Sequence, residues 1–219
     1  AFAVSISEPS AYELNDNITT AVIVMEVDPV LYGPLLTLTS NYIKNAGPIF
    51  NITQDSPPKG QCDELQQTPV DWKVNDAVKI FDYNGKLFGG VDARCFGNRD
   101  YLSCNNYAYY TTTAILNGKI SQSFTLPKGK YLVQNDLADA IGGPGHASMT
   151  IAKGDSLPDF ADVPARSIGY TDMATGTGIL FVLEEDTRVT FGFVYNFKAG
   201  EQCSYAIRSV NMIGRTGWE

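Results

Sequence analysis

Residues 94–110, with the sequence RCFGNRDYLSCNNYAYY, are a candidate sugar-binding surface. Tyrosine rings can stack on the C–H faces of pyranose rings, and guanidinium and carboxylate groups form paired hydrogen bonds to adjacent hydroxyls. The six candidate ligand-binding residues are Arg94, Arg99, Asp100, Tyr107, Tyr109 and Tyr110. The alternative is that the tyrosines only cover a half-exposed face of a sheet, and the sequence is compatible with both interpretations.

The four cysteines, Cys62, Cys95, Cys104 and Cys203, have no C-x-x-C spacing, and His146 is the only histidine. One histidine cannot complete a Cys/His zinc site by the usual spacings, so no metal site is predicted. Two disulfides in an oxidising compartment are predicted instead. The favoured pairing is Cys95–Cys104 with Cys62–Cys203, and the rival is Cys62–Cys95 with Cys104–Cys203. Free buried thiols are the remaining alternative.

Catalytic patterns are weak in this chain. His146 and Ser148 suggest a nucleophile and a base, but no G-x-S-x-G elbow is present. The acidic residues 184–186 share one predicted turn, where their side chains would point into water and not across a cleft. Neither this turn nor Asp82 with Asp92 has the spacing of an EF-hand. A non-enzymatic protein is therefore predicted, with a hydrolase as the least favoured class.

The composition is typical of a secreted β-protein. The chain has 219 residues, of which 44% are hydrophobic and only 18% charged, and its net charge is −8. The hydrophobic content is sufficient for a buried core. The negative charge repels phosphate groups, so nucleic acid and anionic membranes are not expected as partners. No apolar run approaches the roughly 18 residues of a membrane-spanning helix.

Alternation of apolar and polar residues predicts the strands that would position these candidates. The clearest is RVTFGFVYNF, residues 188–197, and similar patterns occupy residues 120–133, 147–153 and 178–183. In the last strand, residues 203–214, the pattern changes phase, which predicts a bulge near Ser209. About nine or ten short strands without a helical period indicate an all-β fold: an antiparallel sandwich of jelly-roll or immunoglobulin-like topology.

Several segments resemble the galactose-binding-like jelly rolls of secreted carbohydrate-binding modules. They are LTSNYIKNAGPIFN, PVDW, ISQSFTLPKGKYLV, TRVTFGFVYNF and CSYAIRSVNMIG, which together span roughly residues 37–213. The resemblance implies a jelly-roll-like sandwich that binds sugar. No cofactor is predicted apart from a structural calcium, which this family often carries near its first and last strands. The last strand here offers Asn211 and no carboxylate.

Residues 1–36 have no counterpart in that pattern and are predicted to form an N-terminal arm or first strands, before a sandwich domain at 37–219. Phe2, Val4 and Ile6 alternate with small residues, so this strand could join its own sheet or complete a neighbour's. Two functions follow. The first is a secreted or cell-surface carbohydrate-binding or adhesin module. The second is a subunit of an extracellular filament that is joined by N-terminal strand addition.

Overall fold

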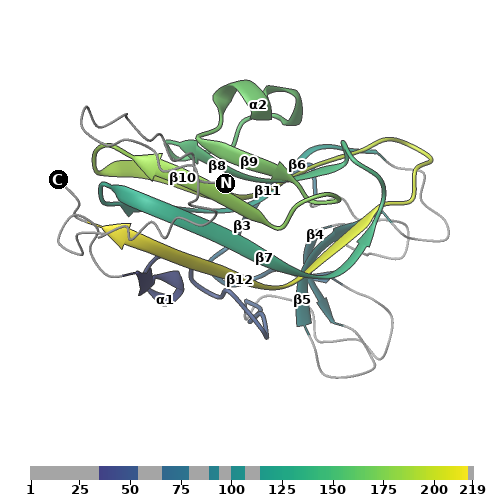
Figure 1. Ribbon diagram of the computed structural model, residues 1–219. Coiled ribbons are helices and arrows are strands. Elements are labelled where there is room, and N and C mark those ends of the chain that lie inside the picture. Colours follow the sequence, from purple (N-terminus) through teal and green to yellow (C-terminus); the bar gives the residue numbers. More distant parts are fainter. Residues whose placement is uncertain (1–34, 54–65, 79–88, 94–99, 107–113, 217–219) are drawn as a thin grey trace, which may run out of the picture.

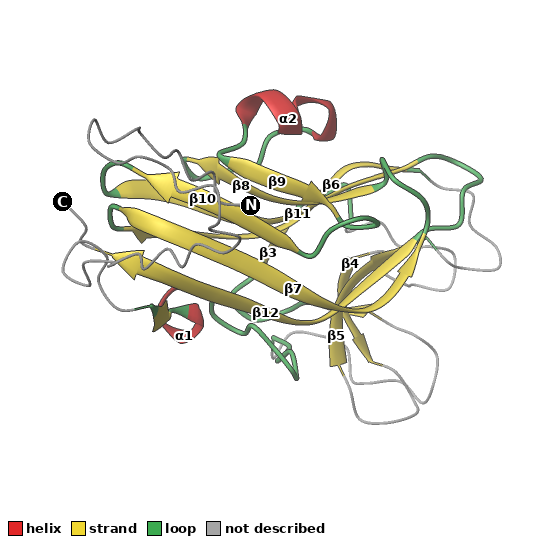
Figure 2. Cartoon of the chain, in the orientation of Figure 1, coloured by secondary structure: helices red, strands yellow, loops and turns green. Residues whose placement is uncertain are grey.

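The computed structural model describes residues 35–53, 66–78, 89–93, 100–106 and 114–216 (Figure 1). In this part of the chain two antiparallel sheets pack face to face, as Figure 2 shows. The predicted all-β antiparallel sandwich is confirmed. The predicted arm lies outside the described residues, except for Leu35 and Leu36.

One sheet has seven strands and the other five. In spatial order, the first contains β10 (Gly178–Leu183), β7 (Gly129–Ile141), β12 (Ser204–Thr216), β5 (Asp100–Asn105), β4 (Gly89–Ala93) and β2 (Gln66–Gln67), and β1 (Leu36–Thr37) also pairs with β12. The second contains β3 (Lys73–Val74), β6 (Ile115–Leu126), β11 (Thr187–Phe197), β8 (Ala147–Lys153) and β9 (Gly169–Asp172). The two-residue strands β1, β2 and β3 are too short to give an alternating pattern, which is why the sequence predicts fewer strands.

Helical structure in the described residues is limited to α1 (Thr39–Tyr42), α2 (Val163–Arg166) and the 3₁₀ turn η1 (Phe160–Asp162). None of these single turns has the length or the apolar character that a membrane-crossing helix would need.

The central strand β11 is buried on both faces. Its predicted inward row, which includes Phe191 and Phe193, is fully buried between the sheets. Val194 on the opposite face is also buried, because it packs with Leu157, which precedes η1, and with Val163 of α2. Figure 2 shows α2 over the outer surface of this sheet. The alternation predicts the inward row correctly but does not reveal the cover on the other face.

The predicted bulge in β12 is confirmed. The register between β12 and β7 shifts between Ala206 and Ile207, and again between Ile207 and Ser209. The second shift adds one residue to β12, so Ile207 and Val210 are both buried although they are an odd number of residues apart.

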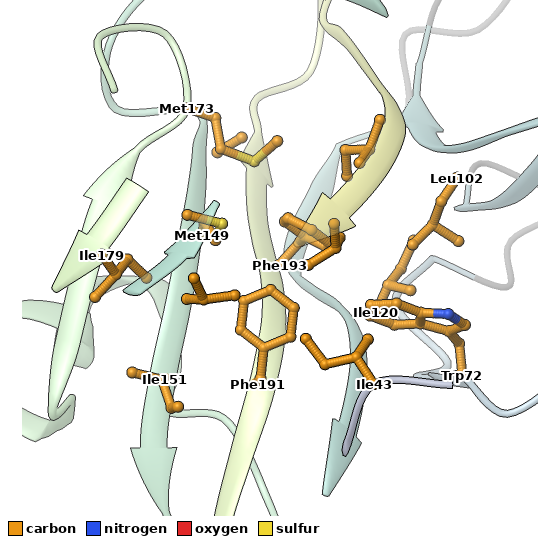
Figure 3. Close-up of a cluster of buried hydrophobic side chains, with 14 of the residues drawn as sticks. Ile43, Trp72, Leu102, Ile120, Met149, Ile151, Met173, Ile179, Phe191 and Phe193 are labelled. Carbon is orange, nitrogen blue, oxygen red and sulfur yellow. The ribbon is translucent and has the colours of Figure 1, made fainter. Parts of the chain in front are cut away.

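Trp72 anchors the core between the sheets. Its ring lies 6.0 Å from that of Phe193 and 6.4 Å from that of Phe50, and its indole N–H donates to the carbonyl oxygen of Asn45 at 2.9 Å. Figure 3 shows Trp72 beside Ile120 within this cluster. The hydrogen bond satisfies the one polar atom of a large buried side chain, so Trp72 contributes both apolar burial and a fixed position.

We expect Trp72→Ala to lower the free energy of unfolding by about 3–5 kcal/mol, because it removes a large buried aromatic side chain and leaves a cavity. Trp72 is 5% exposed, whereas Tyr170 is 48% exposed. Tyr170→Ala is the matched aromatic control and should change the stability by no more than about 0.5 kcal/mol. Urea denaturation of both variants measures the difference, and equal losses would contradict this assignment of the core.

Candidate functional site

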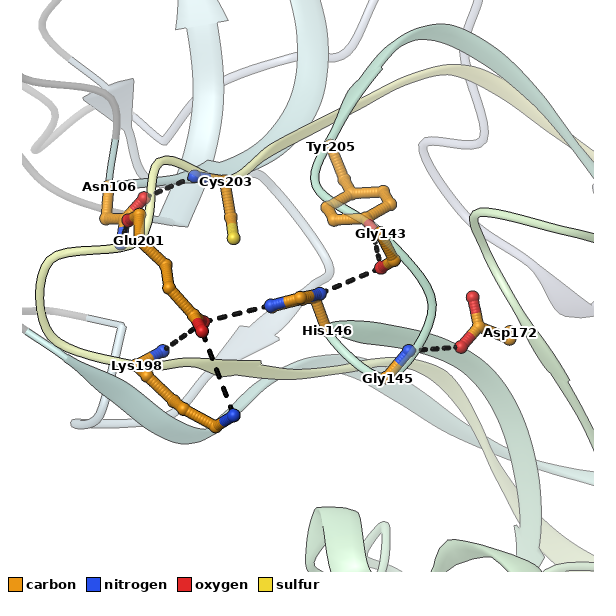
Figure 4. Close-up of polar contacts among 9 residues, drawn as sticks. All are labelled: Asn106, Gly143, Gly145, His146, Asp172, Lys198, Glu201, Cys203 and Tyr205. Carbon is orange, nitrogen blue, oxygen red and sulfur yellow. Dashed lines mark hydrogen bonds and ion pairs between the residues drawn. The ribbon is translucent and has the colours of Figure 1, made fainter.

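Three strand connections meet at one end of the sandwich: residues 142–146, 173–177 and 198–203. Antiparallel pairing of the strands that enter and leave these loops brings them to the same edge. Polar contacts join them there. The backbone N–H of Gly145 donates to the Asp172 carboxylate at 2.6 Å, and a ring nitrogen of His146 lies 2.9 Å from the Glu201 carboxylate (Figure 4).

His146 is held between two acceptors. Its Nδ1 lies 2.8 Å from the carbonyl oxygen of Gly143, and its Nε2 lies 2.9 Å from Oε2 of Glu201. A carbonyl oxygen can only accept, so Nδ1 carries a proton. The Tyr205 hydroxyl donates to the same Gly143 carbonyl at 3.2 Å. The imidazole ring therefore has a fixed orientation, with Nε2 directed at the carboxylate.

The Glu201 carboxylate is surrounded by donors. The hydrogen bond from His146 is the main cause that lowers its pKa below the ordinary value of 4.5, and the backbone N–H of Lys198 and the charge of its ammonium group lower it further. That N–H donates at 3.2 Å, and Lys198 Nζ lies 3.7 Å from Oε1. Glu201 is consequently ionised at neutral pH, and a partly exposed anion with three nitrogen neighbours lies at the loop end.

Asn106 clamps the 198–203 loop to the end of β5. Its side-chain oxygen accepts from the backbone N–H of Cys203 at 2.7 Å, and its amide nitrogen donates to the carbonyl of Glu201 at 2.6 Å. Its own backbone N–H donates to the Cys203 carbonyl at 3.0 Å. Asn106 is buried, so these bonds are shielded from water. One side chain thereby fixes the backbone of both Glu201 and Cys203.

The structure corrects the disulfide prediction for two of the four cysteines. Cys104 and Cys203 are free, buried thiols. Tyr205 pairs with Cys104 across β5 and β12, so Cys203, two residues before Tyr205, lies diagonally from Cys104 on the same face. Burial is the main cause that raises the pKa of both thiols. The pattern of spacings cannot show that both thiols lie in the core. Cys62 and Cys95 lie outside the described residues.

Residues 51–192 match a family described as "Domain of unknown function (DUF5013)". The chain belongs to this family. A search of curated proteins found no match to it.

Solved structures that resemble this DUF5013 chain include two of cyclases from Fischerella. A cyclase from Fischerella sp. TAU is 11% identical, with a TM-score of 0.50 over 83% of this chain and 98% of that one. An apo-form cyclase from Fischerella sp. is also 11% identical, with a TM-score of 0.50 over 82% and 96%. Identity this low shows a common sandwich fold alone. The galactose-binding-like assignment is finer than these matches and stays a prediction.

Most of the predicted sugar-binding residues, Arg94, Arg99, Tyr107, Tyr109 and Tyr110, lie outside the described residues. Asp100 begins β5, and the tyrosine segment follows Asn106 just after its end. At about 3.3 Å per residue, the two ends of β5 are roughly 17 Å apart. The arginine and tyrosine segments thus leave β5 at opposite ends, and the six-residue site stays a prediction. So does the assembly role of Phe2, Val4 and Ile6, which are also outside.

The other sequence candidates do not come together. The Ser148 hydroxyl lies 3.0 Å from that of Thr150 and does not contact His146. The acidic turn at 184–186 is exposed at the other end of the sandwich, where Asp186 accepts from the backbone N–H of Lys128 at 3.0 Å.

Sequence reasoning missed Glu201 and Cys203 as neighbours of His146, and Asn106 as the residue that holds their backbone. The available signal was that GGPGHAS and KAGEQC are both glycine-containing connections between strong strands. Alternate connections of an antiparallel sandwich gather at one end, so these two were candidates to meet there.

We expect Asn106→Ala to lower the free energy of unfolding by about 1–3 kcal/mol, because the buried N–H of Cys203 loses its acceptor. Asn211, exposed on β12, is the matched control, and Asn211→Ala should have little effect. Chemical denaturation followed by circular dichroism measures both. Equal stability of the two variants would show that Asn106 is not a clamp.

Proposed function

We propose that this DUF5013 chain is a non-enzymatic binding module of a secreted or cell-surface protein, and that it binds carbohydrate at the loop end that contains His146 and Glu201. The observation that carries the proposal is the fixed set of charged groups there. The Glu201 carboxylate accepts hydrogen bonds from His146 and from the backbone N–H of Lys198. The Asn106 side chain donates to the carbonyl oxygen of Glu201 and so holds the loop backbone. The catalytic activity of the Fischerella cyclases is not part of the proposal.

The chemistry of the loop end suits a polyhydroxylated ligand. Each sugar hydroxyl can donate to a carboxylate and accept from an ammonium or imidazolium group. Glu201 offers a carboxylate and Lys198 an ammonium group. Both side chains are open to solvent at this edge. Because the supporting backbone is already hydrogen-bonded, little conformational entropy is lost when a ligand binds.

The predicted tyrosine platform is compatible with this position. Tyr107 follows Asn106 directly, and Tyr110 is four residues from it. An extended chain spans at most about 3.6 Å per residue, so these tyrosines start within roughly 14 Å of the Glu201 loop. Connectivity alone therefore allows aromatic stacking and charged hydrogen bonds in one site, without Arg94 or Arg99.

A glycan array followed by calorimetry tests this function. We expect the wild-type chain to retain a defined glycan and Glu201→Gln to bind it at least about tenfold more weakly, because a hydrogen bond to a charged group is worth about 1.5–3 kcal/mol. Glu184→Gln, at the opposite end of the sandwich, is the matched control and should bind as the wild type does. Binding that Glu201→Gln leaves unchanged would refute the proposed position, and a blank array would refute the function.

Self-association by strand addition is a second candidate, favoured by one observation. The edge strand β10 of the larger sheet has two apolar outward residues, Leu180 at 75% exposure and Val182 at 41%. Register places Leu180 beside Leu132 of β7, so apolar surface continues onto the next strand. An N-terminal strand from a neighbouring copy could pair with this edge and cover it.

If strand addition operates, deletion of residues 1–8 should abolish concentration-dependent assembly, and a synthetic AFAVSISE peptide should bind the truncated chain. Burial of Phe2, Val4 and Ile6 would contribute about 1.5–3 kcal/mol each. Leu180→Asp should block assembly as well, whereas Leu116→Asp, an exposed leucine on the other sheet, should not. Light scattering over a range of concentrations gives the result. A wild-type chain that stays monomeric throughout would exclude this candidate.

A further inference from the structure

Three side chains of metal-binding types converge at the loop end from two different connections. They are His146 from the 142–146 loop and Glu201 and Cys203 from the 198–203 loop. One ligand atom of each lies within 4.8 Å of the corresponding atoms of the other two. In Figure 4 the His146 ring and the Cys203 thiol both point into the space next to the Glu201 carboxylate.

One of the two ring nitrogens of His146 can bind a metal ion in place of its hydrogen bond. Nδ1 is committed to the Gly143 carbonyl, and Nε2 faces Oε2 of Glu201 at 2.9 Å. An imidazole lone pair and a carboxylate repel each other unless a positive charge lies between them, and either a proton or a metal ion can supply it. Metal-binding histidines usually donate their second ring N–H to a carbonyl or carboxylate, as His146 does.

The thiol of Cys203 completes the set. The sulfur faces the 142–146 loop, since a Cβ added to Gly142 would lie 3.3 Å from Sγ. Gly142 has φ +123°, a conformation that favours glycine, so the close approach of loop and sulfur depends on its lack of a side chain. Asn106 fixes the backbone of Cys203 and of Glu201 together. The ligands are therefore held by the fold before any metal arrives.

We propose that His146, Glu201 and Cys203 form a zinc site with three protein ligands and a fourth position open to water or an external ligand. A thiolate with an imidazole selects Zn²⁺ over Mg²⁺ or Ca²⁺, which prefer oxygen ligands. Atoms bound to one tetrahedral zinc ion lie roughly 3.3–3.6 Å apart. The three ligand atoms all lie within 4.8 Å of one another, so side-chain rotations would be needed to bring them to this geometry.

Binding of Zn²⁺ exchanges protons for metal. The Cys203 thiol releases its proton to solvent, and so does Nε2 of His146 when it is protonated. The positive charge of Lys198 would repel a bound metal ion, since its ammonium lies 3.7 Å from Oε1 of Glu201. Its side chain is exposed and can turn away, so removal of its charge should strengthen metal binding.

Cobalt titration of the 219-residue chain under reducing conditions tests the site. We expect Co²⁺ to give the visible absorption of four-coordinate cobalt together with thiolate-to-cobalt charge transfer in the near ultraviolet, and Zn²⁺ to displace it. Cys203→Ser should abolish the charge-transfer band. His146→Gln should weaken binding at least about tenfold. Lys198→Met should bind as tightly as the wild type or more tightly.

The other cysteines provide the controls. Cys104→Ala and the double variant Cys62→Ser/Cys95→Ser should keep the band, which identifies the thiolate as that of Cys203. A band that survives Cys203→Ser, or a wild-type spectrum without thiolate charge transfer, overturns the proposal.

If Cys203→Ser does not fold, wild-type protein alone decides the question. Zinc should slow alkylation of Cys203 at least tenfold, as mapped by mass spectrometry, and an equal rate with and without zinc overturns the site. Neither readout involves a glycan, so the zinc site and the carbohydrate-binding proposal can fail separately.

Discussion

Burial of β11 on both faces is the constraint on which the arrangement of this domain depends. One face supplies Phe191 and Phe193 to the core between the sheets, and the other packs Val194 beneath the η1–α2 segment. A strand enclosed in this way and paired with both β6 and β8 cannot shift its register without exposing large apolar side chains. The point at which β11 ends, and so the start of the 198–203 loop, is therefore set by the core.

The candidate site is rigid because its loops are attached to strands of that core. The 198–203 loop leaves β11 and returns as β12, while β12 pairs with both β5 and β7. Asn106, at the end of β5, hydrogen-bonds to the loop just before β12 begins. Glu201 and Cys203 are in this way held by two strands of one sheet and one strand of the other, although neither residue is itself in a strand.

The Cys203 side chain has two sets of neighbours. It lies diagonally from the free thiol of Cys104 inside the core, and it lies beside His146 and Glu201 at the solvent edge. A disulfide with Cys104 and a bond to zinc both use the same sulfur and exclude each other. The zinc site proposed above therefore requires the reduced Cys203 thiol that the structure shows.

The long strands, the inward row of β11 and the bulge near Ser209 were determined by the sequence itself. They could be predicted because alternation and large apolar side chains act locally, over a few residues. The cover over Val194, the burial of Cys104 and Cys203 as free thiols, and the meeting of His146 with Glu201, 55 residues away, were decided only by the tertiary structure. These features depend on the order of the strands in the two sheets. The strand order results from long-range packing of many residues at once. It therefore cannot be predicted from a local sequence pattern.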